Sequence, residues 1–137
     1  MHFFTTYASM GFADAAAAAR EALKRHKFSI LAEIDMRQVL KKHLSLDTRP
    51  YLILSACSLP LAHRAIKADD AIGSMAVCDV VIQEHSDGRV EIFVVDPACT
   101  IGRINHVEMI SIAQELQSLV QQVIDDIESA PKFDRAA

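Results

Sequence analysis

The 137-residue sequence lacks several patterns that mark well-known classes of protein. With only four glycines, it contains neither a phosphate-binding P-loop nor a dinucleotide-binding glycine motif. No apolar run approaches the roughly 20 residues that a membrane-spanning helix needs. The N-terminus shows no charged stretch followed by the apolar segment of a signal peptide. These absences predict a cytoplasmic protein that makes no contact with a membrane.

Basic clusters, paired cysteines and metal-binding histidine motifs are also missing. The net charge is −4, and lysine and arginine are scattered, so we expect no nucleic-acid partner. Three cysteines are too few, and odd in number, for a secreted disulfide scaffold, and they fit free thiols in a reducing compartment. None of the six histidines has HxxxH or HExxH spacing, so no metal site is predicted on a single helix.

The composition is that of a globular domain. Hydrophobic residues make up 51% of the chain and charged residues 23%, which is enough to build a core without disulfides or metals. We expect a single α/β domain over residues 1–128 and a frayed tail over residues 129–137.

Local patterns predict an alternation of strands and helices that ends in a hairpin and a long helix. The predicted strands are His2–Ala8, Phe28–Ile34, Tyr51–Cys57, Val77–Glu84 and Arg89–Val95. The predicted helices are Gly11–His26, a short one capped by Asp35 and ending near Leu44, one from Ser58 to about Lys67, and Asn105–Glu128, with a loop at Asp69–Ser74. Asp87-Gly88 predicts the hairpin turn. The order β-α-β-α-β-α-β-β-α predicts an α/β (α+β) two-layer sandwich with one mixed sheet of about five strands.

Two helices carry clear apolar faces. The first repeats Phe12, Ala16, Ala19 and Leu23 on one side, and the last repeats Ala113, Leu116, Val120, Val123 and Ile127, widened by Ile112 and Leu119. The last helix either lies on the sheet or also pairs with a second copy. Its C-terminal acids, Asp125, Asp126 and Glu128, oppose the helix dipole, which a basic partner surface would explain.

Cys57 is the most informative single residue because it lies where a strand ends and a helix begins. A helix N-terminus there could lower the pKa of the thiol and bind an anion. The alternative is that Cys57 is a small buried apolar residue. If the strand containing Cys78 pairs with the strand ending at Cys57, the two thiols could meet. His63 and His106 are the histidines that could face Cys57.

The sequence resembles the domain of unknown function 302 family. The resemblance is carried by ILSACSLPLAHRAI, SMAVCDVVIQE and DGRVEIFVVDP, preceded by FSILAEID, and covers about residues 3–127. The most specific positions are Ala56, Cys57, Leu61, Ala62, Cys78, Asp87, Gly88, Asp96 and Pro97. Ser55, Ser58-Leu59 and Ala76-Val77 depart from the glycine, Asn-Pro and Leu-Pro that are common in the family. The resemblance implies a small α/β domain, often dimeric, and assigns no activity.

Three hypotheses follow for function. The first is a homodimeric module that binds a small ligand or serves an accessory role, with Ser55, Cys57, Ser58, Cys78 and Asp96 lining the site, because ligands favour strand ends in α/β sheets. The second is a redox protein with Cys57 as the reactive thiolate and Cys78 as the resolving thiol. The third is soft-metal binding by the same two cysteines with a histidine. The sequence leaves the cofactor unknown and does not decide whether a reaction is catalysed.

Overall fold

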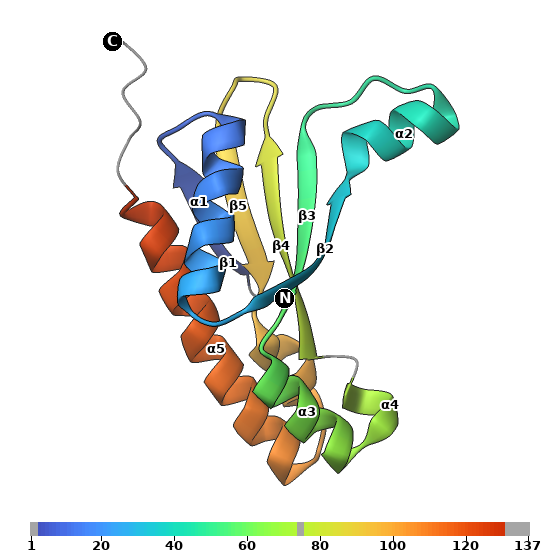
Figure 1. Ribbon diagram of the computed structural model, residues 1–137, viewed down its shortest axis with the longest axis vertical. Helices are drawn as coiled ribbons and strands as arrows, with labels where there is room; N and C mark the ends of the chain where they lie inside the picture. Colours follow the sequence, from blue (N-terminus) through green and yellow to red (C-terminus); the bar gives the residue numbers. More distant parts are fainter. Residues whose placement is uncertain (1–2, 74–75, 131–137) are drawn as a thin grey trace.

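The computed structural model describes residues 3–73 and 76–130, and it contains one five-stranded sheet with α1 and α5 packed against one of its faces (Figure 1). The strands are β1 (Phe3–Ala8), β2 (Ser29–Asp35), β3 (Tyr51–Cys57), β4 (Val77–Glu84) and β5 (Val90–Val95). The helices are α1 (Phe12–Arg25), α2 (Met36–Leu44), α3 (Leu59–Ala68), α4 (Asp70–Gly73) and α5 (Val107–Glu128), with 3-10 turns η2 (Pro97–Cys99) and η3 (Ile101–Arg103). The predicted α+β fold, with helices packed on one sheet of about five strands, is confirmed.

The sheet differs from the expectation in one respect, because every strand pair among the described residues is antiparallel rather than mixed. The order is β1-β5-β4-β3-β2. β1, β4 and β2 therefore run in one direction and β5 and β3 in the other, and α1 crosses the sheet from β1 at one edge to β2 at the opposite edge. The other helical connections join neighbouring strands: α2 lies between β2 and β3, and α3 with α4 lies between β3 and β4. Strand–helix alternation therefore does not produce adjacent parallel strands here.

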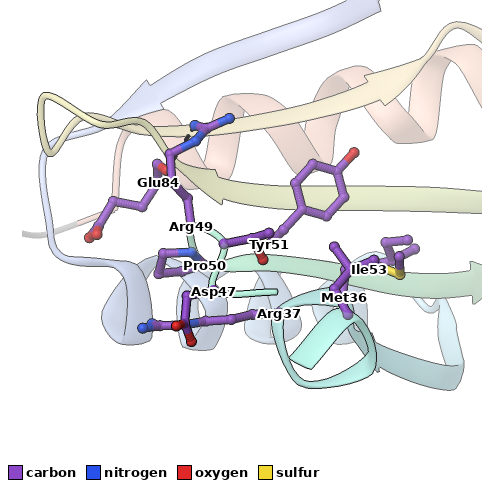
Figure 2. Close-up of a pocket in the computed structure, with 10 residues that line it drawn as sticks. Met36, Arg37, Asp47, Arg49, Pro50, Tyr51, Ile53 and Glu84 are labelled. Atoms are coloured by element: carbon purple, nitrogen blue, oxygen red, sulfur yellow. Dashed lines mark hydrogen bonds between the residues drawn. The ribbon is translucent and has the colours of Figure 1, made fainter. Parts of the chain in front are cut away.

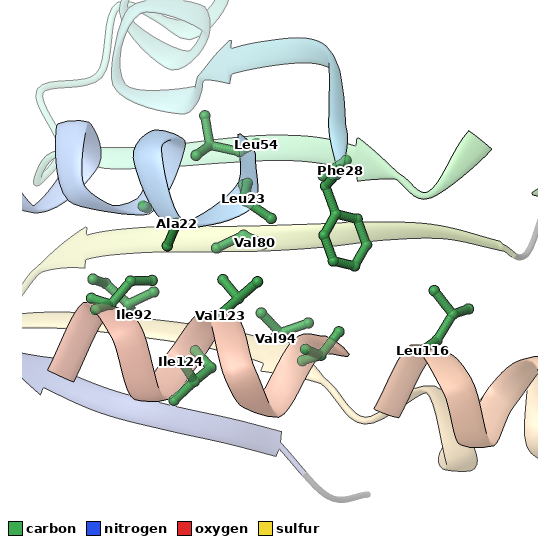
Figure 3. Packing of buried hydrophobic residues seen from close by; sticks show 14 of the residues in the cluster. Ala22, Leu23, Phe28, Leu54, Val80, Ile92, Val94, Leu116, Val123 and Ile124 are labelled. Atoms are coloured by element: carbon green, nitrogen blue, oxygen red, sulfur yellow. The ribbon is translucent and has the colours of Figure 1, made fainter. Parts of the chain in front are cut away.

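The core lies between the sheet and the pair α1 and α5. Figure 3 shows Val80 and Ile92 of the central strands near Val123 of α5, while Leu23 of α1 approaches Leu54 of β3. All five side chains are buried. Each contributes roughly 2 kcal/mol relative to an exposed side chain, so this one face provides most of the driving force for folding.

Both predicted helix faces are found. In α1 the buried residues include a run of alanines, Ala15, Ala16, Ala19 and Ala22, whose small side chains allow close approach to the sheet. In α5 the buried residues are Met109, Ile112, Ala113, Leu116, Val120, Val123, Ile124 and Ile127. Because the chain's own core covers this stripe, it is not free to pair with the α5 of a second copy.

The acidic C-terminal end of α5 lies against basic side chains at the C-terminal end of α1. The Asp126 carboxylate lies 2.6 Å from Nε2 of His26 and accepts a hydrogen bond from Nη1 of Arg25 at 3.1 Å. Both hydrogen bonds lower the pKa of Asp126, and the one from His26 has the larger effect. The C-terminal end of α1 therefore compensates for the unfavourable position of this acid.

The predicted cap of α2 and the predicted hairpin turn are found, whereas the predicted cap of α5 is one residue too early. Asp35 caps α2, accepting a hydrogen bond from the backbone N–H of Gln38 at 3.1 Å. Gly88 has φ +87°, as the predicted hairpin turn requires. The cap of α5 is His106 rather than Asn105, and its Nδ1 accepts from the N–H of Glu108.

Part of the predicted Asp69–Ser74 loop forms the short helix α4, and Ser74 lies outside the described residues. His2 of the first predicted strand and residues 131–137 of the predicted tail also lie outside them. Ser129 and Ala130 are described, and their N–H groups bond back to carbonyls of α5. Among the helices described, none has the length and apolar character required to cross a membrane.

Candidate functional site

The predicted site residues gather at one end of the sheet. β3 ends at Cys57, β4 begins one residue before Cys78, and β5 ends just before Asp96. β3 and β4 pair as the thiol hypothesis requires, with Ala56 opposite Cys78 and Cys57 opposite Val77. Residues directly opposite each other share a face, and neighbours along a strand point to opposite faces. The register therefore directs the two cysteine side chains to opposite faces, and both thiols are free.

Burial keeps both thiols protonated. Cys57 is only 3% exposed, and burial raises the pKa of its thiol. Burial, together with the nearby Cys57 and Asp79, raises the pKa of Cys78 to about 12. The shift at Cys57 is opposite in direction to the lowering expected from the N-terminus of α3. Neither cysteine has the low pKa that activates a thiol for nucleophilic attack.

Ser55 and Asp96, two of the predicted site residues, already have hydrogen-bond partners within the described part of the chain. The Ser55 hydroxyl donates to Oδ1 of Asp79 at 2.7 Å, directly across the β3–β4 pair. Asp96, 9% exposed, accepts from the N–H of Ala98 at 2.9 Å and from Nε2 of Gln117 at 3.0 Å. Asp96 therefore anchors the turn after β5 to α5. These satisfied groups account for the local structure without a ligand.

Two further predicted residues have structural positions. Ser58 is buried and precedes α3, but its hydroxyl makes no cap hydrogen bond. His63 is exposed on α3, while His106 serves as the cap of α5. Over residues 3–73 and 76–130, no three His, Cys, Asp or Glu side chains form a group that could hold a metal ion.

A groove of about 880 Å³ lies near the opposite end of β3. We call it the α2 groove, because α2 forms one of its walls. Its lining residues are Met36, Arg37 and Leu40 of α2, Asp47, Thr48, Arg49 and Pro50 of the connection, Tyr51 and Ile53 of β3, and Glu84 of β4 (Figure 2). The groove therefore combines apolar side chains with several polar groups.

The groove exists because α2 stands away from the main core. The pairing of β2 with β3 shifts register between Ile30 and Ala32, and a bulge of this kind bends a strand. β2 then carries α2 away from α1 and α5, as Figure 1 shows. No residue of α2 is buried. After α2 the chain turns at Ser45, which has a left-handed φ of 54°, and returns to β3.

Hydrogen bonds hold the returning connection in place. Nζ of Lys41 lies 2.8 Å from Oδ1 of Asp47, which ties the connection to α2. Nη1 of Arg49 donates to the backbone carbonyl of Glu84 at 3.0 Å and lies 3.4 Å from Nδ1 of His85. These contacts fix the guanidinium of Arg49 at the end of β4.

One polar atom in the groove lacks a partner. Oγ1 of Thr48 is buried and has no hydrogen-bond partner within the described part of the chain. Such a group is destabilising by roughly 1–3 kcal/mol, so native structures contain few of them. Arg37, in the same groove, has no hydrogen-bond or ion-pair partner among the described residues. Within the described part of the chain, the α2 groove therefore contains a buried polar side-chain atom without a partner and an exposed, unpaired guanidinium.

Arg37, Thr48, Arg49 and Tyr51 are absent from the site residues predicted from the sequence. The sequence signal for them is weak, because the polar stretch Ser45–Pro50 between a short helix and a strand predicts only a loop. Their proximity depends on how β2 carries α2 relative to the ends of β3 and β4.

The comparisons with known proteins agree with the fold. The model of the family described as Domain of unknown function DUF302 matches residues 4–127, in agreement with the resemblance seen in the sequence. A crystal structure of an uncharacterized conserved protein DUF302 from Bacillus stearothermophilus superposes with a TM-score of 0.83. It covers 93% of this chain and 98% of that chain at 23% sequence identity, which shows a shared fold. No curated protein matches the chain.

Proposed function

The chain belongs to the family described as Domain of unknown function DUF302, and because that description assigns no activity, we propose a function from the geometry. The protein is a small-molecule-binding module, and its ligand occupies the α2 groove. A volume of about 880 Å³ lies in the usual range for small-molecule sites. Apolar walls with a few polar groups are also typical of such sites.

The observation that carries this proposal is the unpartnered hydroxyl of Thr48. A bound molecule with a hydrogen-bonding group would satisfy Oγ1, and binding would then recover the free energy lost by leaving it unpaired. Destabilised polar groups of this kind are common where a protein gives up stability for function.

The test is a fragment screen followed by two-dimensional amide NMR. We expect binding fragments to shift the backbone amides of Thr48, Arg49 and Tyr51, and Thr48→Val to weaken their binding. Fragments that shift only amides distant from the groove, or none of the fragments binding, would contradict the proposal.

The site near Ser55, Cys57, Ser58, Cys78 and Asp96 has less support. The Ser55 hydroxyl and the Asp96 carboxylate already have hydrogen-bond partners outside this set, and Cys57 is almost fully buried. Thiol chemistry is disfavoured by the raised pKa of both cysteines. The free thiols do support our proposal of a reducing, cytoplasmic location.

We also propose that the protein is a homodimer, formed through the sheet face opposite α1 and α5. Phe3 and Phe93 contact each other edge to face there at 5.6 Å, and Phe3 remains 49% exposed. Tyr51 and Ile53 of β3 lie on the same face but line the α2 groove, so the interface is placed on β1, β5 and β4. Tyr7 of β1 also remains 49% exposed on this part of the sheet.

Light scattering coupled to gel filtration tests the dimer. Phe3→Glu is expected to yield a monomer with an unchanged circular dichroism spectrum. Val107→Glu is the matched control, because Val107 is 86% exposed at the start of α5. A monomeric unmodified protein would remove the homodimer from the proposal and leave the ligand site intact.

A further inference from the structure

We infer that the ligand of the α2 groove is a small organic anion, with a carboxylate or phosphate group attached to an apolar body. This inference rests on the proposed function and deepens it. It follows from the charges and apolar side chains that line the groove.

The cations of the groove are available to a ligand, whereas one of its two acids is neutralised. Asp47 is paired with Lys41 at 2.8 Å. Arg37 has no partner among the described residues. Arg49 is held by a backbone carbonyl and a histidine ring rather than by a carboxylate, so its charge is not cancelled. Guanidinium groups bind carboxylate and phosphate oxygens through paired N–H donors.

Glu84 is the remaining acid of the lining. Figure 2 shows its carboxyl end directed away from Tyr51 and Ile53. Its backbone carbonyl accepts the hydrogen bond from Nη1 of Arg49. Glu84 therefore helps to position a cation and does not occupy the space beside Tyr51.

The region around the groove is more basic than the rest of the chain. A second hollow of about 540 Å³ shares Arg37 and Asp47 with the α2 groove and is also lined by Asp35, Lys41 and Lys42. Together the two linings carry four cations and three acids, a surplus of one positive charge, whereas the whole chain has a net charge of −4. This small local surplus on an acidic protein favours anions at this place.

The apolar walls set the other half of the ligand. Met36, Leu40, Pro50, Ile53 and the ring of Tyr51 line the same groove. An inorganic anion would leave these side chains without contact, whereas an acyl or aromatic body would cover them. Thr48 Oγ1 adds a hydroxyl that can donate to an anionic oxygen.

The experiment is an amide NMR titration with four probes that share one aromatic ring. Phenylacetate and phenyl phosphate carry the anion, benzyl alcohol is neutral and benzylammonium is cationic. We expect the two anions to shift the amides of Thr48, Arg49 and Tyr51 at millimolar concentration, with affinity that falls as salt is added. Comparing the two anions distinguishes a carboxylate ligand from a phosphate ligand.

Variants of single arginines assign the charge. Arg37→Gln is expected to weaken binding of the preferred anion about tenfold, as loss of one charge-assisted contact does. Arg37 is exposed, so the change does not threaten folding. Arg103→Gln is the matched control: Arg103 is also exposed, but it lies in η3 and not in the groove lining. Equal effects of the two variants would overturn the inference.

The outcomes separate this inference from the proposed function. If benzyl alcohol or benzylammonium binds the groove at least as tightly as the anions, the ligand class is wrong but the groove remains a binding site. If neutral fragments shift the groove amides and the anions do not, the ligand class is again wrong and the groove again remains a binding site. If no fragment of any charge binds there, both the inference and the proposed function fail.

Discussion

Replacing Thr48 with valine should make the free protein more stable. Valine has nearly the shape of threonine, so the change removes the hydroxyl and keeps the volume. Oγ1 of Thr48 is buried without a partner in the described residues, and such a group is destabilising by roughly 1–3 kcal/mol. Thr48 is only half-buried as a residue and lies on a connection outside the main core. We therefore expect the lower limit, a gain of about 1 kcal/mol in the free energy of unfolding.

Urea unfolding measures this gain directly. The midpoint should rise while the slope with denaturant stays unchanged, since the surface exposed on unfolding is the same. For a chain of 137 residues, about 1 kcal/mol corresponds to a rise in melting temperature of roughly 3–5 °C. The same variant should bind the ligand more weakly, so stability and binding should move in opposite directions.

Thr100→Val is the matched control. Thr100 is also half-buried, but its hydroxyl donates to the carbonyl of Pro97 at 3.3 Å. The same substitution should lower the free energy of unfolding there by about 1 kcal/mol, because it breaks a satisfied hydrogen bond. If both variants are destabilised alike, the Thr48 hydroxyl has a partner in the folded protein. The α2 groove would then offer a ligand no unpartnered hydroxyl, which would contradict the proposed ligand site.

Three further predictions concern other parts of the fold. The hydrogen bond from His26 lowers the pKa of Asp126 from its ordinary 3.8. The ionised Asp126 therefore contributes fully to the free energy of unfolding above pH 3.8, and this contribution disappears as pH falls through the lowered pKa of the folded state. Asp126→Asn should flatten the pH dependence of urea unfolding below about pH 4. Burial raises the pKa of Cys78 to about 12, so iodoacetamide at pH 8 should not modify this thiol until the protein unfolds. Mass spectrometry measures the labelling, and rapid modification of Cys78 in the native protein would refute the prediction. Asp96→Ala removes the acceptor for Gln117 and for the turn after β5, and should lower the thermal stability by about 2 kcal/mol; a change below about 0.5 kcal/mol would show that the anchor is unimportant.

Short-range patterns explain why much of the secondary structure is predictable. The strand Tyr51–Cys57 is found with its predicted ends, because Pro50 precedes it and Pro60 favours a helix start directly after it. The apolar stripe of α5 is found because its spacing repeats over many turns. Asp35 caps α2 through a hydrogen bond to a residue three positions away. Each signal depends on residues within one or two turns of each other.

The strand order and direction depend on contacts that are distant in sequence. Phe3 pairs with Val95, and this pairing places β1 beside β5 rather than beside β2. Strand–helix alternation is compatible with either a crossover or a helix inserted between antiparallel neighbours. The choice is made by which faces can be buried together against α1 and α5, and no local pattern contains that information.

The candidate site shows the same division most clearly. By itself the sequence determined that β3 ends at Cys57, that β4 begins near Cys78, and that a polar connection precedes Tyr51. Only the tertiary structure decided the register, which turns the two cysteines to opposite faces, and the bend of β2, which opens a groove beside Thr48. A shift of one residue in pairing reverses the face of every side chain in a strand, so the position of a site depends on long-range packing.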